Sequence, residues 1–152
     1  SIATSIEQIK STEFQVITLW HVLEHLPELK QTLTTLRNKL HQNGRLIVAL
    51  PNPNSLDAKH YKNHWAAYDV PRHLWHFNQK NTENLLRNNG FTLISKNPMP
   101  LDSFYVSLLS EKYLNGKTNI SAFIKAFAVA IRSNMKARKS REYSSIIYIA
   151  KK

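Results

Sequence analysis

The sequence contains no cysteine, only three glycines, and no long uninterrupted apolar run. Without cysteine, the chain cannot form disulfide bonds or metal sites that use thiolate ligands. A membrane-spanning helix needs about 18 or more consecutive apolar residues, so none is expected. The N-terminus, SIATSIEQIK, lacks the basic and then apolar pattern of a signal peptide. We therefore expect a cytoplasmic protein, and the missing initiator methionine predicts that the chain begins inside a longer one.

Acidic residues are also scarce, and the resulting positive charge is unevenly distributed. The chain has 10 Asp and Glu against 21 Lys and Arg, a formal net charge of +11. Residues 111–152 hold 10 of the basic residues and only two of the acidic ones. Such a segment can attract nucleic acid or anionic lipid. The simpler interpretation is a solvated basic face, or charge balanced by acidic residues elsewhere in a longer protein.

Enough apolar sequence remains for one domain with a core, because 42% of the 152 residues are hydrophobic. Short apolar segments predict four strands, at Phe14–Trp20 and at residues 45–50, 91–95 and 143–150. Helical patterns separate these strands. The alternation indicates an α/β fold in which the first two strands are parallel and helices cover the faces.

Capping residues define the ends of the predicted helices. Pro27 is expected to lie in the first turn of the first helix, which is expected to end at Asn43-Gly44. The second is expected to be capped by Asn81 or Thr82 and to end at Gly90. Two further helices are predicted, at residues 101–113 and 120–139.

The last predicted helix carries large apolar side chains at every third or fourth position. We expect this stripe to pack on its own domain, although a basic amphipathic helix can also lie on anionic lipid. Its members are Ile120, Phe123, Ile124, Phe127, Ile131 and Met135.

Residues 55–78 are predicted to form a long loop with short helical turns. They show little apolar periodicity but include four histidines and five aromatic residues. This density of aromatic side chains argues against disorder. Ordered connections of this length are usually functional.

Four segments carry a resemblance to a known family. They are FQVITLWHVLEHLPE (14–28), NGRLIVALPN (43–52), DVPRHLWHF (69–77) and NNGF (88–91). In this order and spacing, they resemble the C-terminal half of a class I S-adenosylmethionine-dependent methyltransferase. The similarity is to the branch with a Leu-Glu-His turn and a Pro-Arg-His-Leu-x-His-Phe loop. It covers nearly the whole chain.

The resemblance implies an α/β fold with a partial Rossmann-like sheet, made of the family's strands four to seven in the order 4-5-7-6. The last strand would lie antiparallel to its neighbours, with helices on the faces. Residues 1–152 would be the C-terminal part of one methyltransferase domain. The cofactor-binding N-terminal half would be absent, because the only glycines, Gly44, Gly90 and Gly116, cannot form the family's Gly-x-Gly loop.

The resemblance also implies S-adenosylmethionine as the cofactor, with Trp20, His21 and Val22 beside its methionine end. These residues follow a predicted strand, and open α/β sheets bind ligands at the carboxyl ends of their strands. The alternative for Trp20 is a structural place in the core.

His21, Glu24 and His25 form an H-x-x-E-H pattern that could hold a divalent metal. Spacings of three and four residues bring such side chains to one face of a helical turn. Some methyltransferases use a similar E-x-x-E-H turn for a metal, but here His21 replaces the first Glu. The alternative is that Glu24 and His25 only cap and brace the turn.

The resemblance places residues 69–77 over the methyl acceptor. His73 and His76 are therefore candidate bases, and His25 and Glu24 join them as candidate catalytic groups. The two segments are expected to meet in one cleft beyond the ends of neighbouring strands.

Three further residues are predicted to contact the acceptor. Arg72 could pair with a phosphate or carboxylate group. Trp65 and Tyr68, from the same aromatic-rich stretch, complete this set. The alternative is a packed lid that places its aromatic side chains inside.

The expected function is methyl transfer in the full-length protein, to an oxygen of a small-molecule or lipid- or sugar-linked acceptor. The chain alone is expected to be inactive. One alternative is a truncated or degenerate module without catalysis, and another is an RNA methyltransferase, which the charge would suit. The apolar edge of Phe14–Trp20 is expected either to self-associate or to be covered by residues 1–11.

Overall fold

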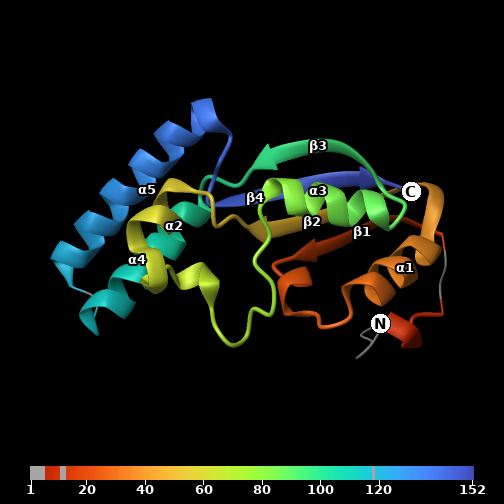
Figure 1. Cartoon of the computed structure of the whole chain (residues 1–152), viewed down its shortest axis with the longest axis horizontal. Coiled ribbons are helices and arrows are strands. Elements are labelled where there is room, and N and C mark those ends of the chain that lie inside the picture. The colour runs from red at the N-terminus through yellow and green to blue at the C-terminus, as the bar shows by residue number, and fades with distance from the viewer. Residues whose placement is uncertain (1–5, 11–12, 118) are drawn as a thin grey trace.

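The computed structural model describes residues 6–10, 13–117 and 119–152. It consists of a four-stranded sheet with helices, and a group of helices at one end of the sheet (Figure 1). The strands are β1 (Phe14–Trp20), β2 (Leu40–Pro51), β3 (Thr92–Pro98) and β4 (Ser145–Lys151). The helices are α1 (Leu29–Lys39), α2 (Leu56–Tyr61), α3 (Gln79–Asn88), α4 (Asp102–Asn115) and α5 (Ile120–Ser140).

The sheet has the order β1-β2-β4-β3. β1 and β2 are parallel, whereas β4 is antiparallel to both of its neighbours. This arrangement confirms the α/β fold and the predicted strand order. Because β1 and β2 are parallel, their carboxyl ends meet at the same edge of the sheet, where ligands bind in open α/β folds.

The main core lies between the sheet and the two helices α1 and α3. Leu33 and Leu36 of α1 and Leu86 of α3 pack with Leu46 and Val48 of β2, and all five are buried. Burial of such side chains is the main driving force for docking these helices on the sheet. The sheet therefore provides a rigid base for the loops at its end.

The predicted end of the first helix at Asn43-Gly44 is wrong. α1 ends at Lys39, and both residues lie inside β2. A Cβ atom at Gly44 would lie 2.8 Å from the carbonyl oxygen of Phe14. Glycine is therefore required at this position by the close approach of β1 to β2, rather than by a helix end.

The predicted cap of the second helix is displaced by one turn. Asn78, rather than Asn81 or Thr82, is the N-cap, and its side chain accepts a hydrogen bond from the backbone N–H of Asn81 at 2.8 Å. Thr82 is buried inside α3. Gly90 follows the helix with a φ of 80°, as expected for a residue after a helix end.

The aromatic-rich stretch forms α2 and two short helical turns, Lys62–His64 and Ala66–Tyr68, which confirms the predicted loop with helical turns. Asp57 of α2 is fully buried and anchors this region. Its carboxylate accepts hydrogen bonds from Trp65 Nε1 at 2.8 Å, Ser133 Oγ at 2.6 Å and Ser144 Oγ at 2.7 Å. One side chain thus links α2, the following turns, α5 and the start of β4.

The expected packing of the apolar stripe of α5 on its own domain is wrong. Helix α5 packs on α2 and α4 through small residues instead. Its buried positions are Ala122, Ala126, Val129, Ala130, Ser133 and Ala137. Small side chains allow helices to approach closely, so the large Ile and Phe residues are left on the outer surface.

The outer edge of β1 has no partner strand among residues 6–10, 13–117 and 119–152. In the N-terminal segment, Ile6 packs against the core, while residues 1–5 and 11 of the expected cover lie outside the described residues. Self-association through this edge stays a prediction. No helix in the described part of the chain is long and apolar enough to cross a membrane.

Candidate active site

The carboxyl end of β1 begins the candidate site. The strand ends at Trp20, which is 50% exposed and therefore not a core residue. His21 follows with a φ of 50°, and its backbone N–H donates to Ala49 O of β2 at 3.1 Å. This left-handed residue turns the chain directly into the short helical turn Leu23–His25.

The loop of residues 69–77 is tied to that turn by backbone and side-chain hydrogen bonds. The N–H of Leu74 donates to the carbonyl oxygen of Glu24 at 2.9 Å. The indole N–H of Trp75 donates to Leu26 O, also at 2.9 Å. These bonds hold the two segments side by side. Of the residues expected to converge on one cleft, His21 and His73 line the same pocket, whereas Glu24 and His25 lie beside His73 without lining it.

Four of the predicted residues lie together in the structure. Glu24 is 1% exposed, and its Oε1 lies 3.2 Å from His21 Nδ1 and 4.0 Å from His73 Nε2. The rings of His25 and His73 are in edge contact, with centroids 4.5 Å apart. The structure therefore surrounds one buried carboxylate with three imidazoles.

Backbone carbonyls fix the tautomers of two of these imidazoles. His73 Nδ1 lies 2.9 Å from Ala67 O, and His25 Nδ1 lies 2.9 Å from Arg72 O. Because a carbonyl oxygen can only accept, Nδ1 of each ring must carry the hydrogen. In the neutral form, Nε2 of each ring then holds a free lone pair, which can take a proton or bind a cation.

The environments of His21 and His73 shift their pKa values in opposite directions. Burial lowers the pKa of His73, and its bond to Ala67 and the nearby carboxylates compensate only in part. Burial also opposes the charged form of His21, but the hydrogen bond to Glu24 and the charges of Asp102 and Glu24 outweigh it, so the pKa of His21 is raised. His73 is thus the imidazole that more readily stays in the neutral form able to accept a proton, while His21 is the better proton-bearing partner of a carboxylate.

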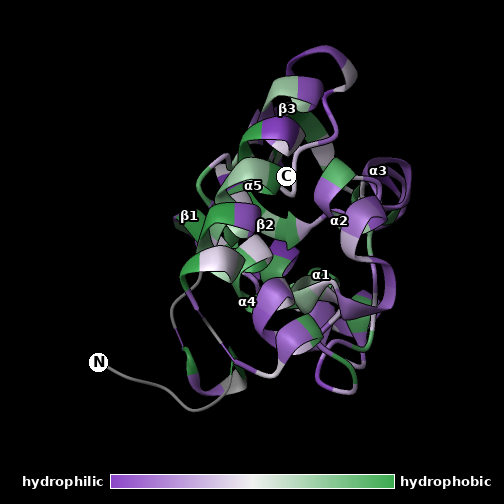
Figure 2. Ribbon diagram, turned by 90° about the vertical axis from the view of Figure 1, so that its left-hand side faces the viewer, coloured by the Kyte–Doolittle hydropathy of each residue, from purple (hydrophilic) through white to green (hydrophobic). Residues whose placement is uncertain are grey.

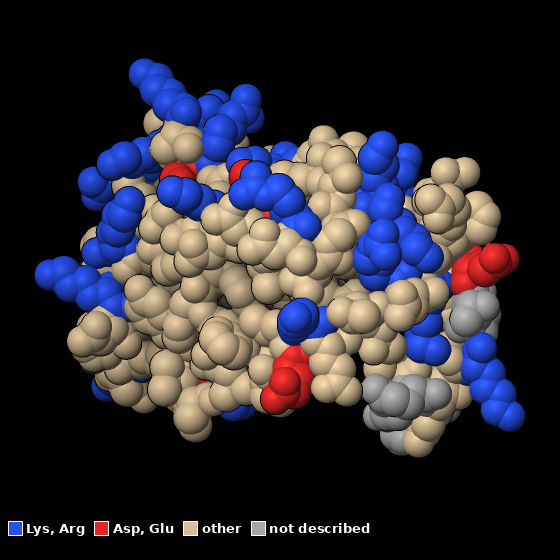
Figure 3. Space-filling view, turned by 45° about the vertical axis from the view of Figure 1, so that its right-hand side comes forward, with Lys and Arg blue, Asp and Glu red and all other residues tan. Residues whose placement is uncertain are grey.

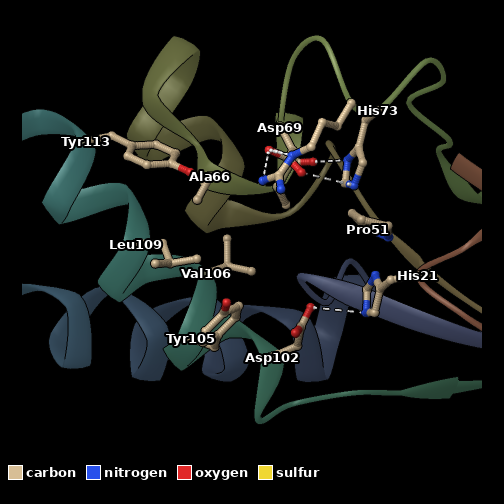
Figure 4. Close-up of a pocket in the computed structure, with 12 residues that line it drawn as sticks. His21, Pro51, Ala66, Asp69, His73, Asp102, Tyr105, Val106, Leu109 and Tyr113 are labelled. Carbon is tan, nitrogen blue, oxygen red and sulfur yellow. Dashed lines mark hydrogen bonds and ion pairs between the residues drawn. The ribbon is translucent and has the colours of Figure 1, made fainter. Parts of the chain in front are cut away.

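A pocket of about 270 Å³ opens beside these groups. Figure 4 shows Asp69 and His73 on one side of it, His21 and Asp102 on the other, and residues of α4 between them. The complete lining consists of His21, Pro51, Ala66, Ala67, Asp69, Arg72, His73, Asp102, Tyr105, Val106, Leu109 and Tyr113. The pocket thus joins titratable groups at the sheet end to an apolar helix face.

Two buried polar atoms at this site have no hydrogen-bond partner among the described residues. They are Glu24 Oε2 and His21 Nε2. The nearest acid to His21 Nε2 is Asp102, at 3.9 Å, which is beyond hydrogen-bond distance. Buried polar atoms are normally satisfied, so these two indicate a place where a bound group or water completes the site.

Glu24, His25 and His73 could also hold a metal ion. Each offers one ligand atom, and these three atoms lie within 4.8 Å of one another. The predicted set was His21, Glu24 and His25, so the structure replaces His21 with His73 in this grouping. The Nδ1 hydrogen bonds of His25 and His73 resemble the carbonyl contacts that orient metal-binding histidines.

Other predicted site residues lie outside the pocket. Trp65 is 1% exposed, donates to Asp57 and belongs to the core beneath α4. Tyr68 packs against that core, and its carbonyl oxygen accepts from the ring of exposed His76 at 3.0 Å. Trp20 and Val22 are exposed at the end of β1 but do not line this pocket.

The α4 wall of the pocket was not predicted. Asp102, Tyr105 and Tyr113 reach the site from a helix that lies far from residues 21–25 and 69–77 in the sequence. The available signal was an acidic residue, Asp102, in the first turn of the helix predicted at residues 101–113. The face of α4 that meets the pocket depends on how α4 packs against α5. The sequence patterns of the two helices do not specify this packing.

Comparison with known proteins gives one family match and a set of similar folds. The family described as a methyltransferase domain matches residues 4–96. No curated protein matches the chain significantly. Among solved structures, the chain is similar to an S-adenosylmethionine-dependent methyltransferase from Archaeoglobus fulgidus, at 17% identity and a TM-score of 0.55. That alignment covers 97% of this chain and 63% of the other.

Two further structures show the range of the fold. A magnesium protoporphyrin IX methyltransferase from Synechocystis PCC 6803, with bound SAH, aligns over 99% of this chain and 50% of its own, at 15% identity and a TM-score of 0.53. The cyclase SpnF aligns over 99% of this chain and 56% of its own, at 14% identity and a TM-score of 0.56. The chain therefore spans one half to two thirds of these proteins, and such low identities show the fold alone.

Proposed function

Because the chain belongs to the methyltransferase-domain family, we propose that the protein containing it transfers the methyl group of S-adenosylmethionine to an oxygen of its acceptor. The acceptor would be a small molecule or a lipid- or sugar-linked group. One observation carries the choice of oxygen. Nε2 of His73 holds a free lone pair at the wall of the pocket, since Nδ1 is fixed as a donor to Ala67.

A neutral hydroxyl is a weak nucleophile, so methylation of oxygen benefits from a base. When bound, the cofactor would supply an electrophilic methyl group on a sulfonium sulfur, and the S–CH3 bond would break as the O–CH3 bond forms, leaving a neutral thioether. In our proposal, Nε2 of His73 takes the hydroxyl proton as the oxygen attacks, and the proton stays on the imidazole until solvent removes it. Asp69 Oδ2 and Glu24 Oε1, at 3.8 and 4.0 Å from Nε2, would stabilise the resulting imidazolium.

Neighbouring residues of the pocket would position the acceptor. Arg72 pairs with Asp69 at 2.7 Å, but its side chain is 72% exposed, so it can turn toward an anionic group of the acceptor. Val106 and Leu109 of α4 offer an apolar wall opposite the polar groups. A pocket with one apolar wall and few polar groups suits an amphiphilic acceptor.

The residues present fit only one end of the cofactor. The end of β1 presents exposed Trp20 and Val22, and His21 faces the pocket, as suits the methionine end of the cofactor. No Gly-x-Gly loop exists in the sequence to approach the rest of it. We propose that the remaining contacts come from a part of the domain outside these 152 residues.

We predict that this chain alone binds S-adenosylmethionine at least about 100-fold more weakly than the full-length protein, because each 1.4 kcal/mol of lost contact costs about tenfold. Isothermal calorimetry on both proteins measures the difference. Equal micromolar affinity would show that this chain holds the cofactor by itself. Failure of the full-length protein to bind would favour a degenerate, non-catalytic module.

The proposed reaction is tested by supplying the full-length protein with isotopically labelled S-adenosylmethionine and a set of hydroxylated acceptors. Amphiphilic alcohols, phenols and glycosides should be included, together with matched amines. Mass spectrometry and NMR of the product identify the methylated atom. Transfer to the amines alone would contradict the choice of oxygen, and transfer to RNA alone would favour the nucleic-acid alternative.

A second candidate mechanism uses a divalent cation held by Glu24, His25 and His73. The closeness of these ligand atoms and the free oxygen of buried Glu24 favour it. A bound cation would stabilise the acceptor alkoxide as a Lewis acid. With oxygen and nitrogen ligands and no thiolate, Mg²⁺, Mn²⁺ or Zn²⁺ would suit the site.

The cation hypothesis predicts that Mn²⁺ or Zn²⁺ alone binds the full-length protein, and that His25→Ala weakens the binding by about 10- to 100-fold. Calorimetry without cofactor or acceptor measures this affinity. His64→Ala is the control, because His64 is exposed and lies outside the cluster. Equal metal affinity of both variants, or no metal binding at all, would contradict the cation hypothesis. The mechanism in which His73 acts as the base would then remain.

A further inference from the structure

The outer face of α5 carries a row of exposed large apolar side chains. Its large side chains are exposed by 81% at Ile120, 55% at Phe123, 61% at Ile124, 50% at Phe127, 39% at Ile131 and 62% at Met135. Spaced three or four residues apart, they form one stripe along the helix. Figure 2 looks onto this end of the molecule, where hydrophobic and hydrophilic residues alternate along the ribbon of α5.

A second stripe along the same helix is basic. Lys125, Arg132, Lys136 and Lys139 are all exposed and follow one another at spacings of three, four or seven residues. Helix α5 contains no Asp or Glu. In Figure 3, Lys and Arg side chains gather at the upper left of the molecule, with few acidic side chains between them.

The two stripes lie side by side on the surface, because the third face of α5 is the one buried against the domain. At 3.6 residues per turn, the buried positions centre on Ala126 and Ser133, on a third side of the helix. The exposed part of α5 is thus half apolar and half basic. An interfacial helix has this composition, with large apolar side chains beside Lys and Arg.

The apolar surface continues onto α4. Between the two helices lies a groove of about 300 Å³, lined almost entirely by apolar atoms. Phe104 and Phe127 face each other across it, with ring centroids 5.1 Å apart. Tyr105 of α4 and Leu101 directly before the helix extend this exposed apolar surface, at 64% and 79% exposure. Exposed apolar patches of this kind mark interaction sites.

We propose that this face, formed by the outer sides of α4 and α5, docks on an anionic lipid bilayer. Charge complementarity selects this occupant. A second copy would bring two basic stripes together, with no acidic residue on α5 to offset them. Nucleic acid would bind the basic stripe but leave six large apolar side chains in water. A bilayer with anionic headgroups accommodates both stripes.

Docking would place the candidate active site next to the bilayer. Tyr105 lines both the apolar groove and the acceptor pocket, so the two spaces share a wall. A lipid-linked or amphiphilic acceptor could then reach the pocket from the membrane side. This consequence for the acceptor rests on the proposed function, whereas the docking itself does not depend on catalysis.

Co-sedimentation of the full-length protein with lipid vesicles tests the proposal. We expect binding to vesicles that contain phosphatidylglycerol, and much weaker binding to pure phosphatidylcholine. The triple variant Phe123→Ser, Ile124→Ser, Phe127→Ser should lower the partition coefficient at least about tenfold, since each side chain loses apolar surface that would enter the bilayer. Circular dichroism should show unchanged folding, because all three side chains are exposed.

Charge is tested separately with Lys125→Gln, Arg132→Gln, Lys136→Gln. This variant should bind anionic vesicles at least about tenfold more weakly, and added salt should weaken the wild type in the same way. The matched control, Lys10→Gln, Lys30→Gln, Lys80→Gln, removes equal charge from exposed sites on other elements and should keep most of the binding. Ile94→Ser, at 47% exposure on β3, is the apolar control.

Several results would overturn the proposal. The first is a wild-type protein that does not bind anionic vesicles, which is expected if another part of the protein covers α5. The second is equal binding by the stripe variants and their controls. The third is a dimer that dissociates in the triple Ser variant without any vesicle binding. Methyl transfer plays no part in these measurements, so failure of the docking and failure of the proposed activity are distinguishable.

Discussion

Replacing His73 by Asn in the full-length protein is expected to lower kcat by about 100-fold or more, the usual contribution of a general base. The side chain of His73 lines the pocket, and its neutral tautomer leaves Nε2 free. Asparagine can still donate a hydrogen bond to Ala67 O but cannot take a proton at the same place. The affinity for S-adenosylmethionine should change little, because we propose that the main cofactor contacts come from outside this chain.

His76→Asn is the matched control for this experiment. His76 belongs to the same loop, with its ring centroid 6.5 Å from that of His73, but it is exposed and does not line the pocket. Its ring nitrogen is bonded to Tyr68 O. Both substitutions remove an imidazole from the same loop. A larger loss of kcat in His73→Asn would therefore come from the position of His73 at the pocket. Similar losses of kcat in both variants would assign the effect to loop structure rather than to proton transfer.

The pH dependence of kcat/KM gives an independent readout. Burial lowers the pKa of His73, so the unprotonated base persists to lower pH than for an ordinary histidine. The acid limb of the profile should therefore lie below pH 6.5, the ordinary pKa of a histidine side chain. This limb should disappear in His73→Asn. An unchanged acid limb in the variant would place the titrating group elsewhere.

The strands could be predicted from the sequence, because buried strands have a simple signature, whereas their order was implied by the resemblance to the methyltransferase family. The predicted strand Phe14–Trp20 has the same bounds as β1, and the strand predicted at residues 45–50 lies inside β2. Helix ends were less predictable. Asn43-Gly44 has the composition of a helix end, but Gly44 is needed for the contact with Phe14, a partner that only the folded sheet supplies.

The apolar stripe of α5 failed as a guide to packing for a physical reason. Periodicity identifies an amphipathic helix but does not say which of its faces meets the protein. In α5 the small residues form the buried face, because α2 and α4 approach closely there. The large residues then form the outer face. A sequence with both an alanine-rich and an Ile/Phe-rich stripe offers two candidate interfaces, and only the structure separates them.

The meeting of the two polar segments of the candidate site could be predicted from the topology of the sheet. The apolar wall that α4 contributes could not. Parallel neighbours bring the ends of β1 and β2 to one edge, so residues 21–25 and 69–77 could be expected to meet. The α4 wall required knowledge of tertiary packing. The prediction that Trp65 contacts the acceptor did not account for its role in the core. Its indole N–H donates a hydrogen bond to buried Asp57 instead.

The buried carboxylate of Asp57 gives the prediction with the largest effect on stability. Asp57→Ala should lower the free energy of unfolding by about 3–5 kcal/mol, as expected when one partner of a buried charged network is removed. The side chain is fully buried, and both of its oxygens accept hydrogen bonds. Without them, Trp65 Nε1 and the hydroxyls of Ser133 and Ser144 lose their acceptor in the core.

The loss should also disturb the site, because this network positions the floor of the pocket. The bonds from Trp65 and Ser133 join the turn before Ala66 to α5, and Ala66 itself lines the pocket. Denaturant unfolding of the full-length protein measures the stability change. Glu83→Ala provides the control, since it removes a carboxylate that pairs with Lys96 at 2.7 Å at the surface. A surface ion pair contributes about 1 kcal/mol or less.

Asp57→Asn separates charge from shape in the same experiment. The amide has nearly the same volume, but its nitrogen would face hydrogen-bond donors where the carboxylate oxygen accepted them. It should therefore recover only part of the stability that Asp57→Ala loses. If the Ala variant were no less stable than Glu83→Ala, the three hydrogen bonds of Asp57 would contribute nothing net. The helices α2 and α5 would then be held together by their small apolar residues alone.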